Sequence, residues 1–168
     1  MASPILIQVA RLIRDLLPHS EQFIKIGRQN FDRTQFEQPF IVVDSLAGDI
    51  PLASSERYNE TSEEMEYSEL VSQPLTIDFY GPTAHALARR FRLLARSQAS
   101  LELQQTLAFT LWHPGAATDL KSLTGQQYGE RMQLECQVHY SPSAIVDILR
   151  IDTAQLRIIG ERGLIYES

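Results

Sequence analysis

The densest charge in this 168-residue chain lies in one short acidic segment. Six glutamates crowd around a single arginine, Arg57, and they are Glu56, Glu60, Glu63, Glu64, Glu66 and Glu69. Carboxylates at this density suit two roles: a solvated loop face, or an acidic patch that faces a basic partner or the inside of a channel. The sequence leaves both open.

A second cluster has the opposite sign and falls on a segment with helical periodicity, at Arg89, Arg90, Arg92 and Arg96. These arginines either solvate the helix or offer a surface complementary to the glutamates. If copies of the chain met side by side, the acidic segment of one copy would lie over the basic helix of the next. Such a contact joins two different surfaces, so it favours head-to-tail rings over two-fold dimers.

Residue types that commonly catalyse reactions or bind metals are present, but their spacing predicts neither role. The four histidines, at positions 19, 85, 113 and 139, show no ligand spacing and no His-Glu-x-x-His string. The lone Cys136 is in phase with the apolar side of an alternating segment, which predicts a small buried hydrophobe. There is no nucleophile elbow and no phosphate-binding loop. We therefore predict no catalytic, metal or cofactor-binding residues.

Composition narrows the class of protein further. The net charge of −6 and the pI near 5.2 argue against tight binding of DNA, which needs a basic footprint, although like charge lets a polyanion pass without sticking. With 43% hydrophobic residues, residues 1–168 are expected to form one domain. One cysteine excludes an internal disulfide. Charged residues interrupt the first apolar segment, so we expect neither a cleaved leader nor a membrane span.

The elements that must position the two charged clusters are the clearest structural prediction. Apolar residues recur at even spacing between Met65 and Phe79, as in a strand with one buried face. A break at Gly81-Pro82 then leads into an amphipathic helix from Ala84 to Ala95. A capping-box pattern at Thr61 and Glu64 allows a short helix before Val71 as the alternative to the first part of that strand.

The remaining segments predict a mixed α+β chain. A helix is expected over residues 4–17, and strands are expected over residues 23–26, 40–43, 108–112 and 131–140, the last with clean apolar and polar alternation. Residues 101–107 predict one further helical turn, and residues 144–159 predict a strand or a hairpin. Polar residues 47–64 predict a long projecting hairpin or loop, and residues 113–129 predict a long loop.

In the order of these elements the chain resembles the neck and tail terminator proteins of tailed bacteriophages. Three local features carry the resemblance: the segment Phe23 to Asn30 after the first helix, the strand from Leu75 to Gly81 running into the helix Ala84 to Ala95, and the strand from Glu130 to Tyr140. The resemblance implies a mixed, mainly antiparallel sheet with the N-terminal and central helices packed on one face. It carries over no catalytic residue.

The resemblance also implies a function and partners. The expected protein is a structural subunit of the virion that forms a closed ring at the neck, terminates the tail tube and joins it to the head connector. A hexamer is the expected copy number, with a dodecamer as the alternative. DNA is expected to pass through the bore without specific binding, and assembly is expected in the host cytoplasm.

Two other functions remain open from the residues alone. The first is a small, non-catalytic accessory domain that binds a ligand or a protein, with residues 47–64 and 115–129 forming the mouth of its site. The second is an enzyme that uses scattered ionisable residues such as Asp44, Asp78 and His139.

Overall fold

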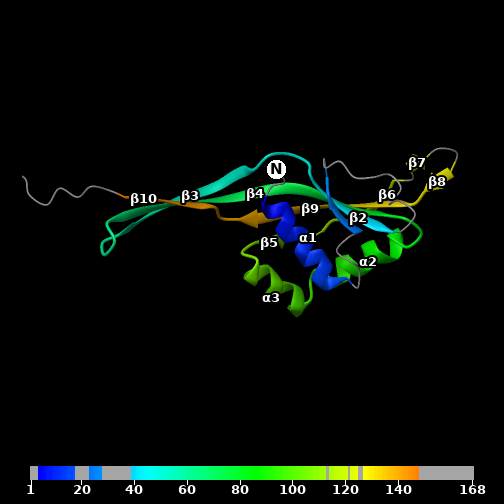
Figure 1. The fold of residues 1–168 in the computed structure, drawn as a ribbon, viewed down its shortest axis with the longest axis horizontal. Helices are drawn as coiled ribbons and strands as arrows, with labels where there is room; N and C mark the ends of the chain where they lie inside the picture. The colour runs from blue at the N-terminus through cyan, green and yellow to red at the C-terminus, as the bar shows by residue number, and fades with distance from the viewer. Residues whose placement is uncertain are drawn as a thin grey trace, which may run out of the picture.

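Three helices cover one face of a long, twisted sheet in the computed structural model (Figure 1). The structure describes residues 4–17, 23–27, 39–112, 114–120, 122–124 and 127–147. The helices are α1 (Pro4–Leu16), α2 (Ala84–Leu94) and α3 (Gln98–Thr106). The main sheet holds β1 (Ile24–Ile26), β2 (Phe40–Ser45), β3 (Ile50–Asn59), β4 (Glu64–Tyr80), β5 (Thr110–Trp112), β6 (Ala117–Asp119), β9 (Arg131–Tyr140) and β10 (Ser143–Asp147). A separate hairpin pairs β7 (Ser122–Thr124) with β8 (Gln127–Gly129).

The strand β4 organises the whole sheet, because four other strands pair with it. Its inner half, from Leu75 to Tyr80, lies between β2 and β9, and its outer half, from Glu64 to Ser72, pairs with β3 on one side. The strand β10 pairs with residues 64–68 on the other side. All these pairings are antiparallel, and β1 with β2 is the parallel pair. The predicted α+β fold with a mixed, mainly antiparallel sheet is confirmed.

A proline in the middle of β4 is tolerated because its neighbour strand changes there. Pro74 has no N–H to donate, so a proline normally breaks a central strand. On one side its register partner is Gln137 of β9. On the other side β2 ends at Ser45 and β3 begins at Ile50, and the Pro74 carbonyl accepts from the N–H of Leu46 at 3.1 Å. The missing donor therefore coincides with the gap between two neighbour strands.

The core lies between the helices and the inner half of the sheet. The helix α1 buries Ile5, Leu6, Val9, Leu12 and Ile13, and α2 buries Ala84, Ala88 and Phe91. The sheet supplies the buried side chains of Ile41, Val43, Leu75, Ile77, Phe79, Met132, Leu134, Cys136 and Val138. These sets match the apolar stripes of the sequence, so the predicted packing of the N-terminal and central helices on one face is confirmed (Figure 1).

The turn between β4 and α2 depends on a glycine. Gly81 has a φ of +97°, a conformation that residues with a side chain rarely adopt, and a Cβ there would lie 3.1 Å from the Cα of Pro39. Its N–H donates to the carbonyl of Glu130 at 3.0 Å, and its carbonyl accepts from the N–H of Ala84 at 2.9 Å. The turn thereby ends the strand and aims α2 back over the sheet.

Several sequence predictions need correction in this frame. Residues 47–64 are mostly a paired strand, so the hairpin prediction is confirmed and the loop alternative is wrong. The short helix after Thr61 is also wrong, because β4 begins at Glu64. The predicted long loop over residues 113–129 contains the strands β6, β7 and β8. The further helical turn is a separate helix, α3, whose N-cap Ser97 accepts from the N–H of Ser100 at 3.2 Å.

Candidate interaction surfaces

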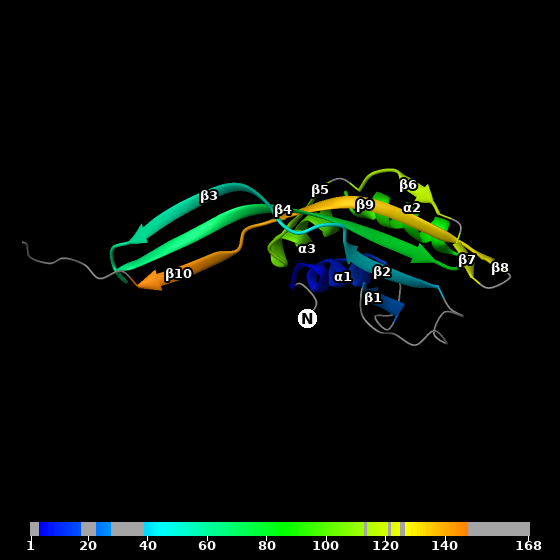
Figure 2. The same cartoon turned by 90° about the horizontal axis from the view of Figure 1, so that it is seen from above.

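An arm of three strands projects from one end of the body, opposite the end that carries α2 (Figure 2). We call β3, residues 64–70 of β4 and β10 the arm. Every residue of β3 and of β10 is exposed, so both faces of the arm are open to solvent. A sheet with neither face covered gains little from hydrophobic burial and is stabilised chiefly by its hydrogen-bonded ladders.

Register divides the arm into two chemically different faces. One face carries the cross-strand rows Tyr58–Met65–Val146 and Glu56–Tyr67–Ala144, and we call it the apolar face. Tyr58 and Tyr67 are each 42% exposed there. Aromatic side chains left open at this level are typical of surfaces that become buried in an assembly.

The opposite face, which we call the acidic face, carries the rows Asn59–Glu64–Asp147 and Arg57–Glu66–Ile145. Glu64 and Asp147 lie directly opposite each other on neighbouring strands. Two like charges in this position repel and destabilise the pairing. Ile145, 63% exposed, lies beside them, so the carboxylates surround an uncovered apolar side chain.

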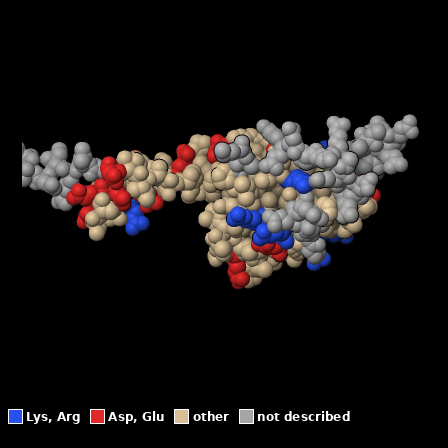
Figure 3. Space-filling view, in the orientation of Figure 1, with Lys and Arg blue, Asp and Glu red and all other residues tan. Residues whose placement is uncertain are grey.

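The six glutamates predicted as one acidic patch are therefore distributed over three places. Glu56 and Glu69 belong to the apolar face, and Glu64 and Glu66 belong to the acidic face. Glu60 and Glu63 lie in the turn between β3 and β4. The sequence could not give this division, because the faces depend on strand register. Figure 3 shows acidic side chains gathered toward the far end of the arm, and basic ones on the helical body.

Side-chain hydrogen bonds order the turn at the end of the arm. The Asn59 side-chain oxygen accepts from the N–H of Thr61 at 3.0 Å and from that of Ser62 at 3.4 Å. Glu63 follows with a φ of +57°, which lets the chain reverse into β4. The turn thus holds a defined shape at the most distant point of the arm.

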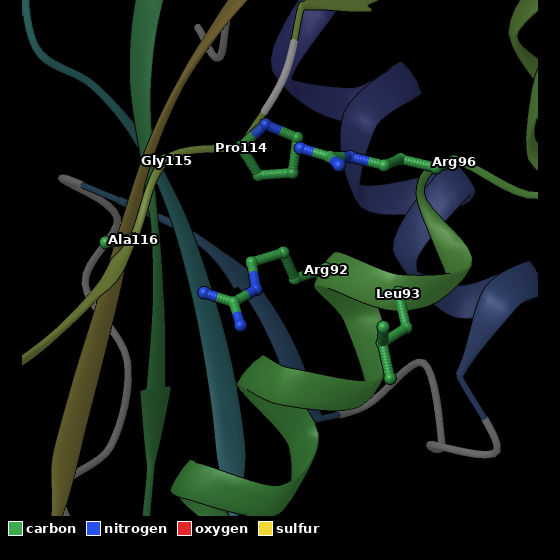
Figure 4. Close-up of a pocket in the computed structure, with 6 residues that line it drawn as sticks. All are labelled: Arg92, Leu93, Arg96, Pro114, Gly115 and Ala116. Carbon is green, nitrogen blue, oxygen red and sulfur yellow. The ribbon is translucent and has the colours of Figure 1, made fainter.

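A basic groove lies at the other end of the molecule, between α2 and the segment that leads into β6. Its larger part, about 550 Å³, is lined by Arg92, Leu93, Arg96, Pro114, Gly115 and Ala116 (Figure 4). A smaller hollow of about 150 Å³ shares Arg92 and adds His85, Arg89, Ala117 and Met132. We call the two together the arginine groove.

Helical spacing explains why these cations share one groove. Residues 85, 89, 92 and 96 follow one another at intervals of four, three and four, which places them along one stripe of a helix. Arg90 falls outside this stripe and outside the lining. Three of the four predicted arginines are therefore brought together, and His85 joins them. In the described part of the chain, Arg89, Arg92 and Arg96 form no ion pair with a carboxylate.

The groove also has an apolar component. Leu93 is 68% exposed, the highest exposure among the large hydrophobic residues of the described chain. It lies between Arg89 of α2 and Arg96, which follows the C-cap of that helix, so cations flank an uncovered leucine. The spacing of His85 with three of the arginines is the sequence signal that could have indicated this side of the groove, although only the arginine cluster was predicted. The facing wall of residues 114–117 could be placed only by the pairing of β6 with β9.

The three residues of the enzyme alternative are not brought together. Asp78 accepts from Nε and Nη2 of Arg131, at 3.2 Å to each of its oxygens, and its side chain is 7% exposed. His139 stacks on Trp112 with ring centroids 5.6 Å apart. Asp44 of β2 is opposite Thr76 of β4, and Asp78 of β4 is opposite Gln133 of β9. His139 of β9 is opposite Ser72 of β4. Asp78 and Ser72 are six positions apart along β4, which separates Asp78 from His139 by roughly 20 Å.

Aromatic contacts complete the surroundings of the Asp78–Arg131 pair. The Arg131 guanidinium lies 5.4 Å from the ring centroid of Tyr80. The Phe40 ring also stacks on the Tyr80 ring, with centroids 4.4 Å apart. Burial and the nearby Asp78 carboxylate raise the pKa of Tyr80 above its usual value. These contacts tie β2, β4 and β9 together on the face of the sheet away from the helices.

Cys136 is buried in the core, as predicted. Burial raises the pKa of its thiol to about 12, so the reactive thiolate is scarce at neutral pH. Among the described residues, no cluster of histidine, cysteine and carboxylate side chains could hold a metal ion. His19 and His113 lie outside the described residues.

The predicted mouth of an accessory binding site is not formed either. The segment 47–64 runs outward into the arm, whereas β6, β7 and β8 lie at the opposite end of the sheet (Figures 1 and 2). The two segments therefore do not converge on one site. Within the described residues, no helix is both long and apolar enough to cross a membrane.

Comparison with known proteins gives this geometry a family. A comparison with curated proteins found no match. The family of phage neck terminator proteins matches residues 5–162, a span that includes every strand of the described residues and their three helices apart from Pro4, the first residue of α1. That span covers nearly the whole chain, so the resemblance noted from the order of the elements is confirmed. The chain belongs to the phage neck terminator family and is a structural protein of the phage neck.

Proposed function

We propose that copies of this chain form a closed ring at the phage neck, and that the ring ends the tail tube, joins it to the head connector and lets DNA pass. The family supports the neck and the virion as the location, and other head and tail proteins as partners. A hexamer is the copy number we favour, with a dodecamer as the alternative. We also propose that the protein works by shape and charge, without catalysing a reaction.

The observation that carries the ring is the arm. Both of its faces leave apolar side chains uncovered: Tyr58 and Tyr67 are 42% exposed on the apolar face, and Ile145 is 63% exposed on the acidic face. Burying such side chains against another molecule removes apolar surface from water, at about 25 cal/mol for each Å². If the arm docks on a different surface of its neighbour and the two copies do not exchange arms, the contact joins two unlike surfaces. Repeated contacts of that type generate rings when the rotation closes.

Charge supports the passage of DNA. The chain carries a net charge of −6, and a bore lined by an excess of carboxylates repels phosphates and does not trap them. Joining the tail tube to the connector needs two further surfaces, on the two faces of the ring. The outer edge strands β5 and β6, with Trp112 at 55% exposure, supply surface for such contacts.

The mass of the purified protein tests the ring. We expect native mass spectrometry or sedimentation velocity to show a closed species of six or more copies, whose fraction rises with protein concentration. Electron microscopy of that species should show a central opening. A chain that stays monomeric up to roughly 100 µM would overturn the proposal, because that concentration is far above the dissociation constant expected for a standard-sized interface.

A further inference from the structure

The geometry points to one specific contact within the proposed ring: the acidic face of the arm docks in the arginine groove of the next copy. This inference rests on the proposed ring and names the surfaces that close it. The first reason is the position of the two surfaces. The arm ends at one extreme of the long axis, and α2 lies toward the other (Figure 1). A contact between them is therefore between different patches of two copies, as a cyclic ring requires.

Charge gives the second reason. The acidic face and the adjoining turn present Glu60, Glu64, Glu66 and Asp147, with Arg57 as the nearby cation opposite Glu66. The groove presents Arg89, Arg92 and Arg96, which form no ion pair within the described chain. Each surface thus holds an excess of one sign, and docking brings the opposite sign to both.

The repulsion inside the arm makes the acidic face a better partner than the apolar face. Glu64 and Asp147 lie opposite each other across β4 and β10. A guanidinium placed over this pair neutralises the repulsion and donates hydrogen bonds from its N–H groups to both carboxylates. On the apolar face, Glu56 is opposite Tyr67 and Glu69 is opposite Ser54, so no such pair exists there.

The acidic face and the arginine groove also match in the spacing of their charges and in their exposed apolar side chains. Carboxylates two residues apart on a strand lie roughly 7 Å apart, and side chains three or four apart on a helix lie roughly 5–6 Å apart. Ile145 lies beside Glu66 on the acidic face, and Leu93 lies between the arginines of the groove. Both are more than half exposed, at 63% and 68%. Docking therefore covers an apolar side chain on each partner while it pairs the charges around them.

Charge reversal tests the contact with two variants. The groove variant is Arg92→Glu with Arg96→Glu, and the arm variant is Glu64→Arg with Glu66→Arg. Each variant alone should need at least about a hundredfold higher concentration than the unaltered chain for half-assembly, because like charges then face each other. An equimolar mixture of the two variants should restore assembly, since every arm of one then meets the groove of the other. The restored rings should contain an even number of copies.

Matched controls separate the contact from net charge. Arg90→Glu changes a charge on the same helix outside the groove, and Glu56→Gln with Glu69→Gln removes two charges from the other face of the arm. Both controls should assemble as the unaltered chain does, whereas Glu64→Gln with Glu66→Gln should weaken assembly about tenfold or more. Circular dichroism and thermal melting of each variant show whether it folds, and the Gln variants serve if a reversed one does not.

The outcomes distinguish this inference from the ring itself. If the unaltered chain forms rings and both reversed variants do too, or if the mixture fails to restore assembly, the arm-to-groove contact is wrong and the ring stands. If the groove variant still forms rings but no longer joins tails or heads, the occupant of the groove is another neck partner and the inference is also wrong. If the unaltered chain stays monomeric, the proposed ring fails first.

Discussion

Asp78 lies on the face of the sheet away from the helices and forms an ion pair with Arg131. Its carboxylate is almost fully buried and takes two hydrogen bonds from the partly exposed guanidinium of Arg131. Paired groups of this type stabilise a fold mainly because removing one partner leaves the other unsatisfied. We therefore assign the pair to the stability of the fold, in contrast to the role that the enzyme alternative gave to Asp78.

Replacing Asp78 with Asn tests that assignment. The change removes the charge and one of the two acceptor positions, so we expect the free energy of unfolding to fall by about 2 kcal/mol. For a chain of this length that corresponds to a melting temperature lower by roughly 4–8 °C. Thermal melting followed by circular dichroism measures it. Glu135→Gln, an exposed carboxylate on the adjacent strand, is the control, and an equal loss in both would contradict a special role for the pair.

For single residues, the sequence predicted the position of a side chain well where burial determines it and poorly where strand register determines it. Cys136 was predicted as a buried hydrophobe from alternation alone, and it lies in the core. The glutamates were predicted as one patch because they are close in sequence. Their separation onto two faces and a turn depends on which residue of β3 is opposite which residue of β4, and that pairing includes an irregularity between Pro51 and Ala53.

At the scale of elements, the arm and the body share a strand but not a core. The core residues of the sheet lie between positions 71 and 79 of β4 and on its inner neighbours, while the outer half of β4 is intermediate or exposed. Stability from packing is therefore concentrated in the body. We expect the arm to contribute to assembly and little to the stability of the monomer.

Shortening the arm tests this division. In the variant, residues 57–66 are replaced by Asn-Gly, which links the cross-strand pair Glu56 and Tyr67 through a two-residue hairpin turn. We expect the melting temperature of the monomer to change by only a few degrees, because no core residue is removed, while ring formation is lost. Melting curves and native mass spectrometry measure the two effects. A fall of more than about 10 °C would show instead that the arm supports the body.

The helices and strands that could be predicted are those whose pattern lies within their own segment of the sequence. The helix α1, the helix α2 and the strand β9 have clear periodicity and were predicted within a residue or two. The sequence allowed either a loop or a hairpin for the segment that contains β3, because Ser54, Ser55 and Asn59 are turn formers. Its pairing along nearly all of the outer half of β4 overrides those preferences. The short strands β6 to β8 are likewise defined by pairing, which no single segment reveals.

For the whole molecule, the distribution of charge matters more than its total. The far end of the arm is acidic and the arginine groove is basic, so one copy presents opposite signs toward its two ends. An accessory domain with a single binding mouth does not need this polarity. A subunit that repeats head to tail uses it to set both the direction and the register of its neighbours.

Salt should therefore weaken self-assembly. Raising the ionic strength from about 0.05 M to 0.5 M shortens the range of exposed charge interactions to a few Å, so we expect the concentration for half-assembly to rise about tenfold or more. Sedimentation velocity at several salt concentrations measures the trend, and the Arg90→Glu variant should follow the same curve as the unaltered chain. A concentration that falls as salt is added would indicate an interface driven by apolar burial instead of charge.

The uninterrupted run of β4 from the tip to the core has a mechanical consequence. Seventeen residues of one strand connect the far end of the arm to residues that pack against α2, without an intervening loop. A pull on the tip of the arm would be carried along β4 as shear across its ladders with β2 and β9. Hydrogen bonds loaded in that direction must break together, so in the proposed ring β4 would resist stretching of the contact between adjacent subunits.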